Sequence, residues 1–104
     1  MERVIVLGLS GCGHCESLAT SLREENIPFK FIDADENGKF ADRMEDLLGV
    51  EDYPMVILED SKESTYLYRV SSLKEAKASP IGLGTKIGCA SLDNMVAIIK
   101  KYVK

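Results

Sequence analysis

The stretch that decides the fold is residues 4–15, which read VIVLGLSGCGHC. Its first half is a continuous apolar run rich in β-branched side chains, which is the pattern of a central strand covered on both faces. Ser10 and Gly11 are turn residues, and behind them Cys12 and Cys15 stand three positions apart. We therefore predict a buried strand, a short turn and then a cysteine pair.

The residues that follow the turn have the periodicity of an amphipathic helix, which we expect to end near Asn26. Its apolar face is formed by Cys15, Leu18, Ala19 and Leu22. A second strand, marked by Phe29, Phe31 and Ile32, follows Pro28 and ends at Asp33. A strand, a crossover helix and a strand in this order predict a parallel pair.

The middle of the chain predicts a second helix and a hairpin. The helix is marked by Phe40, Met44, Leu47 and Leu48 and stops at Gly49, a residue that tolerates a left-handed conformation at a helix end. The two strands are Met55–Leu58 and Thr65–Val70, and the polar residues from Glu59 to Ser64 form the turn between them.

The last third of the chain is less regular. We expect residues 71–86 to form a loop with an optional helical turn over residues 73–77, because Pro80, Gly82, Gly84 and Gly88 interrupt any longer pattern. The final helix starts with Ser91 as its N-cap and runs to about Tyr102. Its inward residues are Leu92, Met95, Val96, Ile99 and Val103.

The predicted element order is β-α-β-α-β-β-α, in an α/β fold. The simplest packing is a four-stranded mixed sheet flanked by three helices, in a single domain over residues 1–104.

Composition argues against several classes of function. The chain has 13 Lys and Arg against 17 Asp and Glu, without a basic block, so nucleic-acid binding is disfavoured. No apolar stretch approaches the length of a membrane span, and the N-terminal apolar run is too short for a signal peptide. Three cysteines, two of them in one motif, fit a reducing compartment. We expect a soluble cytoplasmic monomer that binds neither membranes nor nucleic acid.

The cysteine pair carries the predicted chemistry. Cys12 should lie at the amino end of the first helix, where unpaired N–H groups and the helix dipole stabilise a thiolate. Cys15, one turn further on, should be shielded and within reach. Cys12 would then attack a disulfide and Cys15 would resolve the mixed disulfide. A His14 imidazolium would stabilise the thiolate and place the potential on the less reducing side of about −270 to −180 mV.

The alternative chemistry for two such cysteines is half a zinc site. A zinc site needs about four ligands, and beyond the pair the sequence supplies only His14, inside the same turn, and Cys89. We therefore predict no metal site. Cys89 could be glutathionylated or could oxidise with the active pair, but a buried thiol that packs as a small hydrophobe is at least as common, so we assign it no chemistry of its own.

On three stretches the sequence resembles a glutaredoxin. These are the opening strand, C-x-x-C motif and helix, the approach Leu47–Pro54 to a strand, and Ile87-Gly88-Cys89 before the last helix. The resemblance implies a thioredoxin-like fold in which Pro54 follows a cis peptide bond and faces the cysteines. It also implies that the Tyr53 backbone pairs with an extended substrate or with glutathione, and that Gly88, Cys89 and Ser91 hold the glutamyl end of glutathione.

The chain departs from the family pattern at several of these positions. Gly13-His14 replaces the usual Pro-Tyr between the cysteines and is instead similar to the pair in protein disulfide isomerases. Leu9 stands about where a lysine often precedes the motif, Cys89 replaces the second glycine of a Gly-Gly pair, and Ser91 replaces an acidic residue.

The resemblance implies a dithiol thiol–disulfide oxidoreductase that reduces protein or glutathione mixed disulfides, in electron transport and redox homeostasis. Its partners would be disulfide-containing proteins such as ribonucleotide reductase, with glutathione or a dedicated reductase as reductant and no permanently bound cofactor. Three alternatives stay open: a thioredoxin-like reductase or oxidant that does not use glutathione, a glutaredoxin that binds an iron–sulfur cluster between two subunits, and a redox-inert scaffold.

Overall fold

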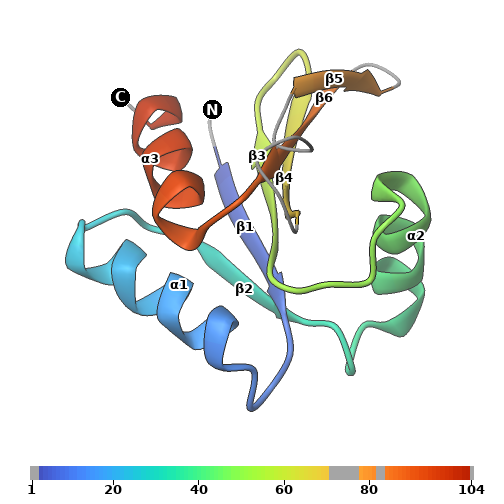
Figure 1. Cartoon of the computed structure of the whole chain (residues 1–104), viewed down its shortest axis with the longest axis horizontal. Helices are drawn as coiled ribbons and strands as arrows, with labels where there is room; N and C mark the ends of the chain where they lie inside the picture. The colour runs from blue at the N-terminus through green and yellow to red at the C-terminus, as the bar shows by residue number, and fades with distance from the viewer. Residues whose placement is uncertain (1–2, 71–77, 82–83, 104) are drawn as a thin grey trace.

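The architecture is a mixed sheet between helices, seen here in a computed structural model that describes residues 3–70, 78–81 and 84–103 (Figure 1). The described elements follow in the order β1 (Arg3–Gly8), α1 (Gly13–Glu24), β2 (Lys30–Asp33), α2 (Gly38–Leu48), β3 (Met55–Glu59), β4 (Ser64–Arg69), β5 (Ala78–Ile81), β6 (Gly84–Cys89) and α3 (Leu92–Tyr102). This is the α/β, thioredoxin-like arrangement that the sequence predicts, with two additional strands.

The described strands form one sheet in the order β2-β1-β3-β4-β6-β5. The pair β1 and β2 is parallel, with Val6 opposite Phe31, so the predicted crossover is confirmed. The pairs β1–β3 and β3–β4 are antiparallel, and β4–β6 is again parallel. It follows that β1 and β6 run in the same direction. Their carboxyl ends lie at the same end of the sheet, where β3 begins.

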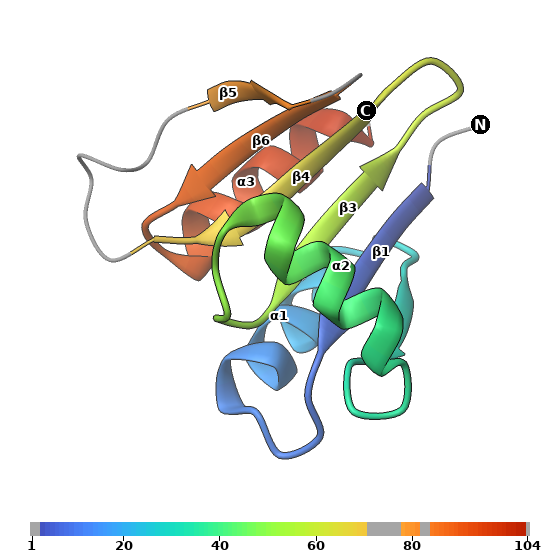
Figure 2. The same ribbon diagram turned by 90° about the vertical axis from the view of Figure 1, so that its right-hand side faces the viewer.

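The helices cover both faces of this sheet (Figures 1 and 2). On one face, Val4 and Val6 of β1 belong to a core cluster with side chains of α1 and α3. On the other face, Ile5 and Leu7 belong to a second cluster with side chains of α2. Because successive residues of a strand point to opposite faces, the continuous apolar run in β1 supplies both cores.

The prediction of a four-stranded sheet is wrong, because part of the segment predicted as a loop forms β5 and β6. Pro80 fits β5 because this strand lies at the sheet edge, where a residue without an N–H group is tolerated. Gly84 and Gly88 lie inside β6. A Cβ at Gly84 would collide with the backbone oxygen of Ser64 in β4, so this glycine permits a close approach of two strands. The helical turn proposed for residues 73–77 lies outside the described residues.

Two predicted helix ends are confirmed. Gly49 ends α2 with a φ of 71°, in the left-handed region, and its N–H donates to the Glu45 oxygen at 2.8 Å. Ser91 is the N-cap of α3, and its Oγ accepts the Asn94 N–H at 3.1 Å. The inward position predicted for Val103 is wrong, because α3 ends at Tyr102 and the Val103 residue is 37% exposed.

Candidate redox site

The loop that carries the chain from β1 into α1 is fixed at both sides. The Cys12 N–H donates to the Leu9 oxygen at 3.2 Å, and Gly11 between them has a φ of 78°, which favours glycine. The Ser10 hydroxyl donates to the Asp33 carboxylate at 3.0 Å and thereby ties the loop to the end of β2. These bonds hold Cys12 at the amino end of α1.

Cys12 is the N-cap residue of α1. Its sulfur accepts the Cys15 N–H at 3.2 Å, and its carbonyl oxygen accepts the Glu16 N–H at 3.0 Å. The sulfur therefore occupies the place of a capping oxygen, next to N–H groups that have no partner within the helix. A negative charge at this position is favoured by the donors and by the helix dipole.

Cys12 and Cys15 are joined by a disulfide bond, with their Cα atoms 5.3 Å apart. The two residues differ in access to solvent, since Cys12 is half-buried and Cys15 has an exposed fraction of 0%. Gly13 and His14 between them are exposed, and a Cβ added at Gly13 would meet no atom within 4 Å. An incoming disulfide can therefore approach Cys12 but not Cys15.

The loop before β3 places a proline at the same end of the sheet. The Tyr53–Pro54 peptide bond is cis, as the resemblance implies, and Pro54 is buried next to Met55, which pairs with Leu7 of β1. The Tyr53 hydroxyl donates to the Glu45 carboxylate of α2 at 2.5 Å. Partial burial and this carboxylate hold the pKa of Tyr53 well above its usual value, so the hydroxyl stays a donor.

The segment predicted to hold the glutamyl end of glutathione also lies at this end. Gly88 and Cys89 close β6 opposite Tyr68 and Arg69 of β4, and Ser91 follows as the cap of α3. The Cys89 thiol is 0% exposed and lies 3.7 Å from the Ile87 oxygen, and burial raises its pKa to about 11. The whole residue is buried, and the Cys89 oxygen accepts the Val70 N–H at 3.0 Å. The binding roles of Gly88, Cys89 and Ser91 stay predictions.

Strand direction brings these segments together. One end of the sheet holds the ends of β1 and β6 and the beginning of β3. This end of the molecule therefore carries the cysteine pair, Pro54 and the start of α3. An accessible sulfur on a helix amino end, backed by a shielded sulfur within bonding distance, is an arrangement suited to disulfide exchange.

Sequence reasoning missed three contacts around the pair. Besides the bond from Ser10 to Asp33, Gly8 lies close to both Cys15 and Phe31 of β2, since a Cβ built on Gly8 would be 3.0 Å from atoms of each. The signal for Gly8 was present, because a glycine in a strand of branched residues often marks a close approach of other atoms. The signal for Ser10 was not, since its partner lies 23 residues away.

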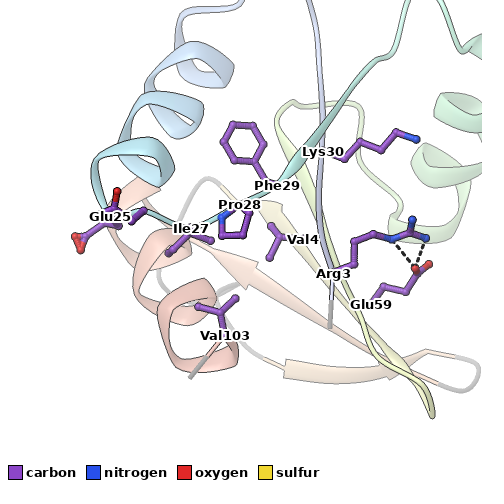
Figure 3. A pocket seen from close by; sticks show the side chains of 10 residues that line it. Arg3, Val4, Glu25, Ile27, Pro28, Phe29, Lys30, Glu59 and Val103 are labelled. Carbon is purple, nitrogen blue, oxygen red and sulfur yellow. Dashed lines mark hydrogen bonds and ion pairs between the residues drawn. The ribbon is translucent and has the colours of Figure 1, made fainter. Parts of the chain in front are cut away.

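One pocket does not belong to this site. It has a volume of about 910 Å³ and lies around Arg3 and Val4, at the beginning of β1 and thus at the opposite end from Cys12. Figure 3 shows the Arg3 side chain directed toward Glu59, with which it forms an ion pair at 2.5 Å. A smaller hollow of about 440 Å³ adjoins the redox site and is lined in part by Leu9, Cys15 and Phe31.

Across residues 3–70, 78–81 and 84–103, three or more His, Cys, Asp or Glu side chains nowhere gather as they would around a metal ion. Among the same residues, every helix is too short or too polar to cross a membrane.

The fold and the cysteine pair together define a thioredoxin-like protein of the thiol–disulfide oxidoreductase class. The family model of glutaredoxin matches residues 4–62, which is more than half of the chain. The chain therefore belongs to the glutaredoxin family. A search of curated proteins found no match. The matched segment includes Cys12, Cys15, Tyr53 and Pro54 and ends before β4, so the family match does not reach Gly88, Cys89 or Ser91.

Proposed function

We propose that this protein is a dithiol oxidoreductase in which Cys12 is the attacking thiolate and Cys15 the resolving thiol. The observation that carries the proposal is the asymmetry of the pair. Cys12 is accessible and caps α1, whereas the bonded Cys15 is fully buried one turn into the helix. The sulfur that can be ionised is thus also the sulfur that a substrate can reach.

The reaction proceeds in two exchanges. The Cys12 thiolate attacks one sulfur of a substrate disulfide, the substrate S–S bond breaks, and the second substrate sulfur leaves as a thiolate that takes up a proton. Cys15 then loses its proton and attacks the Cys12 sulfur. The mixed disulfide breaks, the substrate leaves reduced, and the two electrons that it gained have come from the Cys12–Cys15 dithiol, which ends as a disulfide.

His14 acts on the potential of the pair. It is exposed in the first turn of α1, between the two cysteines, and an imidazolium there would stabilise the Cys12 thiolate and so the reduced form. We expect His14→Ala to make the pair more reducing, as measured by equilibrium with glutathione and its disulfide. The matched control is Glu16→Gln, also exposed in this turn, since it changes charge without removing an imidazole. A potential unchanged by His14→Ala would contradict this role.

Glutathione is the reductant that we propose, with disulfide proteins such as ribonucleotide reductase as substrates of a cytoplasmic monomer. The amino end of α3 supports this, because it lies at the same end of the sheet as Cys12 and its N–H groups suit a carboxylate. The backbone of Tyr53, before the cis Pro54, would pair with the cysteine of the tripeptide. Two molecules of glutathione return the disulfide to the dithiol and leave as oxidised glutathione.

The experiment that tests the mechanism is a trap. In cell extract, the Cys15→Ser variant should retain its partner as a stable mixed disulfide on Cys12, because the resolving sulfur is missing. The Cys12→Ser variant is the control and should retain nothing, although it keeps Cys15 and Cys89. Mass spectrometry of the adduct identifies the partner. No adduct on Cys12, together with slow alkylation of its thiol, would refute the proposed function.

A second experiment decides on the reductant. Reduction of a glutathionylated peptide is followed with glutathione and glutathione reductase, or with thioredoxin reductase alone. Turnover with the first system supports glutathione as the reductant. Turnover with the second system only would assign the protein to the thioredoxin-like alternative. In that case Ser91→Lys, which places a cation at the amino end of α3, should leave the turnover with thioredoxin reductase unchanged.

A further inference from the structure

Gly8 lies next to the buried sulfur of Cys15. It is the last residue of β1 and is itself buried. A Cβ built at this position would lie 3.0 Å from both Cβ and Sγ of Cys15, and 3.0 Å from Cε2 of Phe31. Contacts this short are rare for a Cβ, so a side chain at residue 8 would require Cys15 or Phe31 to shift.

The need for glycine at this position is one of space. The backbone of Gly8 is ordinary strand: it pairs with Asp33 of β2, and its oxygen accepts the Ala34 N–H at 2.8 Å. Gly11 and Gly49 have positive φ angles, whereas Gly8 does not. Alanine would therefore fit the backbone of residue 8, and any effect of Gly8→Ala must act through the side chains of Cys15 and Phe31.

The two neighbours differ in their freedom to move. Phe31 is 41% exposed on the edge strand β2 and can turn outward. Cys15 is 0% exposed and, in the disulfide, its sulfur is bonded to Cys12 and cannot rotate away from residue 8. In the dithiol the bond is absent, and the Cys15 side chain can change rotamer.

We propose that Gly8, with Phe31 beside it, is a positioning residue that sets the depth of Cys15 and thereby the equilibrium between dithiol and disulfide. It acts through Cys15 and touches no substrate. A methyl group at residue 8 penalises the disulfide more than the dithiol, since only the disulfide fixes the sulfur against it. The inference rests on the proposed function, in which Cys15 is the resolving thiol.

The test is the redox potential of Gly8→Ala, measured against a dithiothreitol buffer. We expect the equilibrium to shift about tenfold toward the dithiol, which is about 30 mV for a two-electron couple. Gly38→Ala is the matched control, because a Cβ there meets nothing within 4 Å and Gly38 lies in α2. Its potential should equal that of the unmodified protein. A folded Gly8→Ala protein with an unchanged potential overturns the inference.

A second readout separates positioning from a general loss of structure. In the Cys15→Ser background, Gly8→Ala should leave the rate and pH dependence of Cys12 alkylation unchanged. In the dithiol protein it should prolong the life of the mixed disulfide severalfold. A change in Cys12 reactivity of the same size in both backgrounds would mean that α1 as a whole has moved, which contradicts a specific role.

A third variant keeps the inference testable if Gly8→Ala does not fold. Phe31→Ala removes a partly exposed side chain and opens the other wall next to Gly8. In the reduced Cys12→Ser background, Cys15 should then be alkylated severalfold faster. An unchanged rate of alkylation overturns the role of Phe31. The potential does not depend on any substrate. A shifted potential in a protein without oxidoreductase activity would refute the proposed function and leave the role of Gly8 standing.

Discussion

The buried thiol of Cys89 makes the stability of the fold depend on pH in a way that can be calculated. Burial raises its pKa from an ordinary 9.0 to about 11. The folded protein therefore keeps this proton in a range of pH where the unfolded chain has lost it. The stabilising contribution is fully present below about pH 9 and is lost as the pH rises through the folded value of about 11.

The size of the effect follows from the difference of two pKa units, from 9.0 to about 11. At about 1.36 kcal/mol per unit, the free energy of unfolding should fall by roughly 2 to 3 kcal/mol once the pH exceeds both values. This is a large part of the stability of a small domain, which is about 5–15 kcal/mol. Other groups titrate in this range as well, so the effect has to be isolated by a comparison.

The assay is urea unfolding at a series of pH values in a Cys12→Ser/Cys15→Ser background, which removes disulfide exchange. The protein with Cys89 is compared with the same protein carrying Cys89→Ala. The difference between the two unfolding free energies should be constant below about pH 9 and should shrink by about 2 to 3 kcal/mol by about pH 11. A difference that stays constant over the whole range would refute the reasoning, since Cys89 would then ionise as easily in the folded state.

Two further changes act on the loops around the redox site. Tyr53→Phe removes the hydrogen bond to Glu45 and should lower the free energy of unfolding by about 1 kcal/mol, a shift in Tm of about 4–8 °C in a thermal melt; an unchanged Tm would contradict this. Ser91→Ala removes the cap that accepts the Asn94 N–H and should also cost about 1 kcal/mol in urea unfolding, whereas Ser91→Asp should keep the stability, and equal losses in both variants would argue against capping.

The parts of the fold that the sequence predicts are those with a local signal. The continuous apolar run of β1, the helical spacing that begins at Cys15 and the cap at Ser91 each depend on neighbours in the chain. The strands β5 and β6 have no such signal. Pro80 is acceptable because β5 lies at the edge, and Gly84 is required because Ser64 of β4 approaches it, and both conditions exist only once the sheet is assembled.

The same distinction applies to the candidate site. Cys12 and Cys15 were predicted because their spacing and their place between a strand and a helix are visible in the sequence. The anchoring of the loop by Asp33, and the contact of Gly8 with Phe31, join residues that are more than twenty positions apart. Pairing of β1 with β2 brings them together, so they become visible with the register of that pair.

The three cysteines illustrate how position assigns chemistry to one residue type. Cys15 and Cys89 are both fully buried, and the pKa of Cys89 is raised, so neither offers an ionised sulfur to a substrate. Cys12 alone combines access to solvent with donors that favour a thiolate. Mixed disulfides should therefore form on Cys12 first, and the sulfur that attacks Cys12 in the second exchange is its bonding partner, Cys15. We expect Cys89 to stay outside this exchange, because it is fully buried in the core cluster that β6 shares with side chains of α1 and α3.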